Sequence, residues 1–147
     1  MRLWRLTRRP FADLSGEGAR LFGGRWTSPG RPSVYLSEDP ALTVLEVRVH
    51  LDLPFELLPD DYLLLRVDLP DGLPVQDIGR LDAEPRLHGD AWLAATATAL
   101  LRVPSAIVPE SRNLLLNPRH PDAARAVIGY SRPWRFDPRL FRGQGGA

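Results

Sequence analysis

The sequence predicts one domain of the α+β class. Its 147 residues are a typical length for a single domain with its own hydrophobic core. Short apolar segments with strand-like alternation outnumber the helix-like segments. The two kinds do not alternate regularly, which argues against a doubly wound parallel sheet. The 15 prolines are scattered, so we expect short elements joined by many loops.

The first part of the chain is expected to contain three extended segments. Residues 2–6 (RLWRL) alternate between apolar and polar side chains and predict a strand. Residues 8–20 are interpreted as a loop or a short helix. Two further extended pieces, GGRWT at 23–27 and SVYLS at 33–37, are expected to flank a turn at SPGRP.

A helix is predicted over residues 39–50, because Asp39 is a favourable N-cap and Pro40 stands at the first helical position. The following segment, 61–70, alternates as expected of a strand. One face of that strand is expected to carry Leu63, Leu65, Val67 and Leu69.

The second half of the chain is expected to contain short elements around one longer helix. That helix is predicted over 89–103, with Asp90 as its N-cap. The remaining expected elements are strands at 104–110 and 113–118, a short helix at 120–127 and a closing strand at 134–141. The single domain is taken to span residues 1–147, with a disordered tail at 143–147.

Composition excludes several kinds of chemistry. All 19 residues counted as lysine or arginine are arginine, so a lysine nucleophile or Schiff base is impossible. The absence of cysteine excludes disulfides, thiolate zinc sites and cysteine nucleophiles. Because His50, His88 and His120 lack the spacing of a zinc motif, we expect no bound metal.

Charge and hydropathy predict a soluble, cytoplasmic protein. The formal net charge of +1 gives no indication of direct binding to nucleic acid or to an anionic membrane. The basic N-terminus is not followed by the apolar stretch of a signal peptide, and no apolar run reaches transmembrane length.

Glu46 occupies an unexpected position on the helix predicted over 39–50. At about 100° per residue, Leu42, Leu45 and Val49 share one arc, and Glu46 projects from this apolar face or its border. A carboxylate there is costly without a partner. Glu46 is therefore either a boundary residue that reaches solvent or an arginine, or a functional carboxylate.

Arg25 follows two glycines in the motif GGRW. Such glycines can relieve a bend or bulge, with Arg25 as an ordinary ion-pair partner. They can also let the backbone approach an anionic ligand that the arginine binds. Three other candidates have common structural explanations: Tyr35 as a core aromatic, Ser105 at a turn or strand end, and Asn117 in an Asx turn before Pro118.

Taken together and in order, these motifs resemble the RES family. The segments that carry the resemblance are GGRW (23–26), VYLSE (34–38), LE (45–46), VPSAIVPE (103–110) and NLLLNPRHP (113–121), within a likeness that spans about residues 2–140. The resemblance implies an ADP-ribosyltransferase-like fold, with mixed, short-stranded sheets and a few helices in a single domain. It also implies a toxin of a bacterial toxin–antitoxin pair that degrades NAD⁺.

The resemblance assigns roles to individual residues. Glu46 and Arg25 correspond to the catalytic glutamate and arginine. The substrate-binding candidates are Arg25, Tyr35, Ser105, Ser111 and Asn117, where Ser105 or else Ser111 is the family serine. NAD⁺ is then a substrate, with no other cofactor. The expected partner is an Xre-like helix-turn-helix antitoxin, and a homodimer is expected as well.

The expected reaction is chemically consistent with these residues. Cleavage of the nicotinamide–ribose bond releases neutral nicotinamide and leaves positive charge on the ribose, which a carboxylate such as Glu46 stabilises. A guanidinium such as Arg25 matches diphosphate oxygens, Tyr35 is suited to stack on nicotinamide, and a serine hydroxyl can bind ribose or phosphate. Water and inorganic phosphate both remain open as the acceptor.

Two other functions remain open at this stage. The first is a protein ADP-ribosyltransferase that uses the same site. Such enzymes often carry a second acidic residue two positions before the key glutamate, where this chain has Val44. The second is a catalytically inactive module that only binds an antitoxin.

Overall fold

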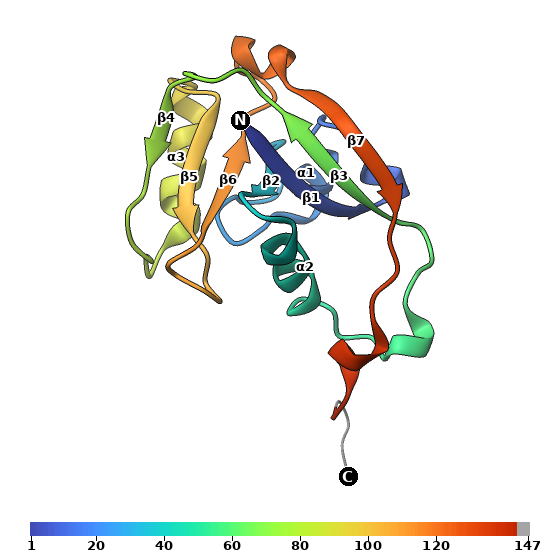
Figure 1. Cartoon of the computed structure of the whole chain (residues 1–147). Coiled ribbons are helices and arrows are strands. Elements are labelled where there is room, and N and C mark those ends of the chain that lie inside the picture. Colours follow the sequence, from blue (N-terminus) through green and yellow to red (C-terminus); the bar gives the residue numbers. More distant parts are fainter. Residues whose placement is uncertain (144–147) are drawn as a thin grey trace.

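The computed structural model describes residues 1–143, in which seven strands form one sheet of order β4-β5-β6-β2-β1-β3-β7 (Figure 1). The strands are β1 (Arg2–Arg8), β2 (Val34–Ser37), β3 (Tyr62–Asp68), β4 (Val75–Asp77), β5 (Leu100–Pro104), β6 (Arg112–Leu116) and β7 (Val127–Pro133). The pair β4–β5 is parallel and every other pair is antiparallel. The predicted α+β class with a mixed, short-stranded sheet is confirmed.

Within residues 1–143, three α-helices and three 3₁₀ turns lie between strands, and a fourth 3₁₀ turn follows β7. They are α1 (Glu17–Phe22), α2 (Pro40–Arg48), α3 (Pro85–Ala95), η1 (Arg9–Phe11), η2 (Phe55–Leu57), η3 (Pro121–Arg125) and η4 (Pro138–Phe141). Helix α2 begins as predicted, because the Asp39 carboxylate accepts hydrogen bonds from the backbone N–H groups of Ala41 and Leu42, and Pro40 needs no such bond.

Two helices cover different parts of the sheet (Figure 1). Helix α3 packs on β5 and β6 through a cluster that contains Trp26, Trp92 and Leu101. Helix α2 packs against β1 and β2. The half-buried Val44 and Val47 of α2 join a second cluster with aromatic residues of the C-terminal segment. The two helices therefore cover separate regions of the sheet, α3 over β5 and β6 and α2 over β1 and β2.

Strands β1 and β2 pair at a single position, Trp4 opposite Ser37. If this antiparallel ladder continued, residues 5–7 of β1 would face residues 34–36 of β2. Instead the two strands diverge. Residues 5–7 and residues 35–37 line a common cavity. The sheet therefore opens where α2 lies against it.

The helix predicted over 89–103 has other boundaries in the structure, and this prediction was wrong in its second half. Helix α3 begins at Pro85 and ends at Ala95, where Thr96 adopts a left-handed conformation (φ 53°). Residues 100–104 instead form β5, which pairs with β4, a strand that precedes α3, and with β6, the next strand along the chain. Asp90 is not an N-cap, because its carboxylate accepts hydrogen bonds from the backbone and side chain of Ser28.

Three predicted strands are also wrong. Residues 105–110 form a turn, residues 23–27 an irregular segment, and 134–141 a coil that ends in η4. Strands β4 and β7 were not predicted. The strands expected within 2–6, 33–37, 61–70 and 113–118 and the short helix within 120–127 are confirmed. The predicted disordered tail lies outside the described residues, except for Gly143.

Gly89 provides a test of how α3 is seated. A methyl group at this buried position would lie 1.7 Å from the carbonyl oxygen of Trp26. Alanine normally stabilises a helix by about 1 kcal/mol relative to glycine. We expect Gly89→Ala to destabilise the fold instead, by roughly 1–3 kcal/mol, because the backbone of α3 or of Trp26 must move to make room for the methyl group. Urea denaturation measures this difference.

Gly18 in α1 is the matched control. A methyl group there would lie 3.6 Å from the ring of Phe11, an ordinary contact. Gly18→Ala should therefore be neutral or stabilising. Equal effects of the two substitutions would contradict the close packing of α3 on Trp26.

Candidate active site

Two adjoining cavities meet beside residues 23–25, and the inner one lies where β1 and β2 diverge. The inner cavity has a volume of about 410 Å³ and is lined by parts of β1, β2, α1 and α2. The outer basin, about 950 Å³, lies between residues 23–25 and the start of α3. Both are bordered by Gly23, Gly24, Arg25 and His50, which therefore mark the junction between them.

The Glu46 carboxylate faces the inner cavity and is held there by two donors. The Ser105 hydroxyl donates to Glu46 Oε1 at 2.6 Å, and Asn113 Nδ2 donates to the same oxygen at 2.8 Å. The Ser37 hydroxyl in turn donates to Asn113 Oδ1 at 2.7 Å. Glu46 Oε2 has no hydrogen-bond partner within residues 1–143, which leaves this oxygen available to a ligand.

Glu46 lies on the inward face of α2, but this face differs from the predicted one. Leu42 and Thr43 are buried, whereas Leu45 and Val49 are exposed to solvent. The predicted apolar arc was therefore wrong for two of its three members. Glu46 still points inward, because it follows Thr43 by three residues, and both line the inner cavity.

Ser105 is fully buried, at 0% exposure, and does not line the inner cavity. Besides donating to Glu46, its hydroxyl accepts hydrogen bonds from the backbone N–H groups of Ile107 and Val108. These bonds form the turn that replaces the predicted strand. In this structure Ser105 therefore positions Glu46 rather than facing the cavity. Ser111 borders neither cavity, although its carbonyl accepts a hydrogen bond from the backbone of Ser105.

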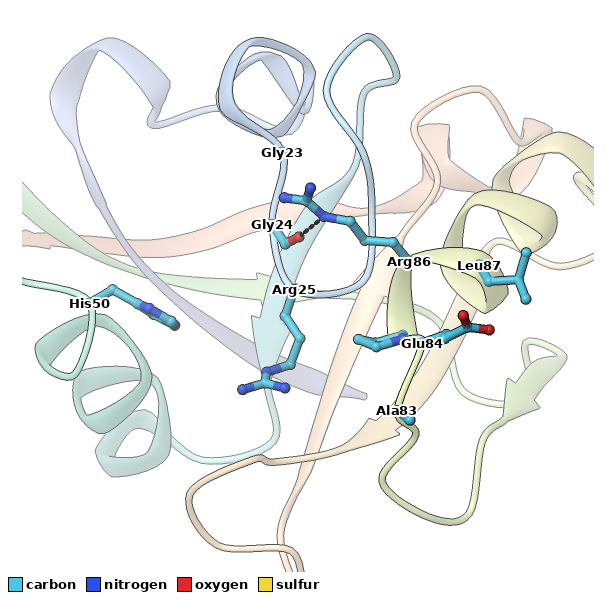
Figure 2. Close-up of a pocket in the computed structure, with 9 residues that line it drawn as sticks. Gly23, Gly24, Arg25, His50, Ala83, Glu84, Arg86 and Leu87 are labelled. Atoms are coloured by element: carbon cyan, nitrogen blue, oxygen red, sulfur yellow. Dashed lines mark hydrogen bonds between the residues drawn. The ribbon is translucent and has the colours of Figure 1, made fainter.

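Arg25 extends from residues 23–27 into the junction of the two cavities (Figure 2). Its side chain forms no hydrogen bond or ion pair with any part of the chain that the structure describes. An arginine without a carboxylate partner at the mouth of a cavity is suited to bind an anionic ligand. The interpretation of Arg25 as an ordinary ion-pair residue is not supported.

The two glycines before Arg25 have separate structural reasons. Gly23 ends α1 with a positive φ of 69°, which favours glycine. Gly24 lies against Tyr35, and a methyl group on it would be 2.5 Å from the Tyr35 hydroxyl oxygen. That hydroxyl accepts a hydrogen bond from the Trp26 backbone N–H and shares another with the Thr27 side chain. Burial raises the pKa of Tyr35, so the phenol remains neutral.

Asn117 does not belong to this site, and its candidacy as a substrate-binding residue is corrected. Its side chain is 1% exposed and accepts a hydrogen bond from the Arg119 backbone N–H, which is an Asx turn. It borders a different cavity, together with Arg31 and Leu93. The site thus combines Arg25, Tyr35 and Glu46 at the cavities, with Ser105 behind the glutamate.

Sequence reasoning missed three residues of the site. Asn113, which holds Glu46, has the register position opposite Ser37, so its role depends on a pairing of distant strands. Arg5 lines the inner cavity and donates to the carbonyls of Phe11 and Asp13, while burial lowers its pKa to about 10. Arg86 lines the outer basin. The position of Arg5 within the alternating apolar and polar residues of β1 was a sequence signal for its role. No sequence pattern indicated a role for Arg86.

Fold and site together define an α+β protein with a carboxylate, a tyrosine and an unpaired arginine around a two-part cleft. The fold matches a chain in the crystal structure of the M. tuberculosis MbcT–MbcA toxin–antitoxin complex. The TM-score is 0.77 at 23% identity, over 96% of this chain and 86% of that chain. The sequence matches the RES domain over residues 2–138, and the chain belongs to this family.

Similar proteins cover nearly the whole chain. A protein of Sphingobium sp. (strain YBL2), named Prs ADP-ribosylating toxin, is 39% identical over a match of length 144 that covers 88% of this chain and 88% of that one. A Pseudomonas putida (strain KT2440) protein, named Toxin Res, is 42% identical over a match of length 135 that covers 87% of this chain and 92% of that one. Among the described residues, none of the helices is long and apolar enough to cross a membrane.

The contact between Gly24 and Tyr35 is open to a direct test. Gly24→Ala would push a methyl group into the Tyr35 hydroxyl, so we expect a loss of roughly 1–3 kcal/mol of stability. Thermal unfolding measures it. Gly79→Ala is the control, because a methyl group there meets no atom within 4 Å. A Gly24→Ala protein as stable as Gly79→Ala would show that the two residues are not in contact.

Proposed function

We propose that this protein is a toxin that consumes NAD⁺ by cleaving the bond between nicotinamide and ribose. The observation that carries the proposal is the Glu46 carboxylate, held through one oxygen by Ser105 and Asn113, with its other oxygen free in the inner cavity. Membership of the RES family and relatives named as toxins support it.

In this proposal the nicotinamide ribose occupies the inner cavity and the diphosphate lies near Arg25. Phe11, Phe22 and Tyr35 give the inner cavity aromatic walls, which suit a flat pyridinium ring. The Arg25 guanidinium at the junction offers several N–H groups to phosphate oxygens. The substrate therefore has its reacting bond beside Glu46.

The reaction needs little proton transfer from the protein. The bond between C1′ of the ribose and the nicotinamide nitrogen breaks, and its electron pair goes to the nitrogen, so nicotinamide leaves as a neutral molecule. The ribose acquires the character of an oxocarbenium ion, which Glu46 Oε2 stabilises through its charge or through a ribose hydroxyl. Attack by water then yields ADP-ribose and a proton, whereas attack by phosphate yields ADP-ribose 1″-phosphate.

Ser105 and Asn113 contribute by fixing the carboxylate before the substrate arrives. Both donate to the same oxygen of Glu46, so the second oxygen keeps one direction. Such preorganisation lowers the reorganisation needed in the transition state. The buried Ser105 therefore acts as a positioning residue in this mechanism.

Transfer of ADP-ribose to a protein is the second candidate. The Sphingobium relative, 39% identical, is named an ADP-ribosylating toxin, which favours this acceptor. Val44, at the position where many protein-modifying enzymes carry a second acidic residue, lies outside the inner cavity and packs near Trp4. That placement favours water or phosphate. Incubation of the protein with lysate and labelled NAD⁺ separates the two, since labelled protein bands form only on transfer.

We also propose that an antitoxin neutralises the protein. The similar solved chain belongs to a toxin–antitoxin complex, which supports a partner of this kind. Expression without the antitoxin should stop bacterial growth and deplete NAD⁺. The Xre-like type of the antitoxin and the homodimer come from the family resemblance and remain predictions.

Glu46→Gln tests the proposed catalytic carboxylate. The amide keeps the shape of the side chain but removes its charge, so we expect nicotinamide release from NAD⁺ to fall by at least about a hundredfold. Chromatography of the products, with and without phosphate, measures release and identifies the acceptor. Glu56→Gln, an exposed carboxylate in η2, is the control. Most of the activity surviving in Glu46→Gln would sink the proposed mechanism.

Ser105→Ala and Ser111→Ala test which serine supports Glu46. Loss of the Ser105 hydroxyl removes one of two donors to a carboxylate, so we expect kcat to fall about tenfold or more with a smaller change in KM. Ser111→Ala should retain near-normal kcat. The assignment would be reversed if Ser111→Ala were the slower enzyme, with melting temperatures confirming that both variants are folded.

A further inference from the structure

The outer basin contains an arginine, Arg86, to which the proposed reaction at Glu46 assigns no role. Its lining includes Arg25, Arg86 and His50. Figure 2 shows Arg86 extending from α3 across the space between residues 23–25 and the start of α3 to the Gly24 carbonyl, while Arg25 points away from Arg86 and the carboxylate of Glu84 turns toward Leu87. The basin therefore presents positive charge to whatever occupies it.

We infer that the outer basin binds the adenylate half of the dinucleotide, with Arg86 as its main anionic contact. This inference rests on the proposed function, since NAD⁺ is two nucleotides joined by a diphosphate. The site likewise has two parts that meet at Gly23, Gly24, Arg25 and His50. A ligand that fills both parts must pass between Arg25 and His50. That position suits the diphosphate.

Arg86 is placed to act on the adenylate side of this junction. It comes from the first turn of α3, and its Nε donates to the Gly24 carbonyl at 2.9 Å. This bond fixes the direction of the guanidinium, as Figure 2 shows. The terminal nitrogens of Arg86 have no hydrogen-bond or ion-pair partner within residues 1–143. They are free to contact the phosphate that carries the adenosine.

The two arginines should contact different parts of the dinucleotide. Arg25 borders both cavities and so lies near the diphosphate as a whole, whereas Arg86 borders the outer basin but not the inner cavity. A substrate without the adenylate half should depend on Arg25 and be much less sensitive to Arg86. Nicotinamide mononucleotide is such a substrate, because it retains the reacting ribose and one phosphate.

The test compares Arg86→Ala and Arg86→Lys with the unmodified protein on NAD⁺ and on nicotinamide mononucleotide. Loss of a charge-assisted contact should raise the KM for NAD⁺ about tenfold, with lysine restoring part of the loss. The KM for nicotinamide mononucleotide should change about twofold at most. Arg119→Ala, an exposed arginine at a different cavity, is the matched control.

Calorimetric titration with AMP tests the basin without any turnover. AMP should bind the unmodified protein and bind Arg86→Ala about tenfold more weakly. Absence of AMP binding, or equal binding by both proteins, would overturn the inference. So would a fall in kcat that is equal for both substrates, because Arg86 would then act only by holding Gly24. If the unmodified protein released no nicotinamide but AMP bound through Arg86, the proposed function would fail while the adenylate site would stand.

Discussion

The whole site depends on the early divergence of β1 and β2. Sheets usually close such a gap with further backbone hydrogen bonds, but here the ladder stops after Trp4 and Ser37. The space between the strands becomes the inner cavity, and both strands supply its walls. Helix α2 lies against the same two strands and brings Glu46 to the opening. A regular sheet with the same side chains would have no room for a ligand.

A short chain of polar groups then fixes the carboxylate within this gap. Ser37 on β2 donates to Asn113 on β6, and Asn113 and Ser105 both donate to Glu46 on α2. These bonds join two regions that are distant in sequence, residues 37–46 and residues 105–113, and they satisfy only one of the two carboxylate oxygens. Partly buried polar networks are costly when a member lacks a partner. The arrangement therefore favours a ligand that completes it.

The parts that could be predicted from the sequence are those decided by local chemistry. The cap of Asp39 on α2 follows from neighbours within one turn, whereas the inward position of Glu46 was predicted from an apolar arc of which only Leu42 is buried. The end of α3 at Thr96 could not be predicted, because residues 100–104 pair in the sheet with β4, which precedes α3, and with β6, which follows β5. The same holds for Asn113, whose role arises from its pairing across β2. Ser105 was recognised as a candidate residue from the sequence. Its complete burial, which keeps it out of the cavity lining, was not predicted.

The anchoring of residues 23–27 has a thermodynamic consequence for ligand binding. Gly24 bonds through its N–H to Thr27 and through its carbonyl to Arg86, and the Trp26 N–H bonds to the Tyr35 hydroxyl. The main chain on either side of Arg25 is thus already ordered before an anion arrives. Most of the entropy lost on association then comes from a single side chain rather than from a loop. The entropic cost of binding should consequently contain little from loop ordering, and association should need no slow rearrangement of the backbone.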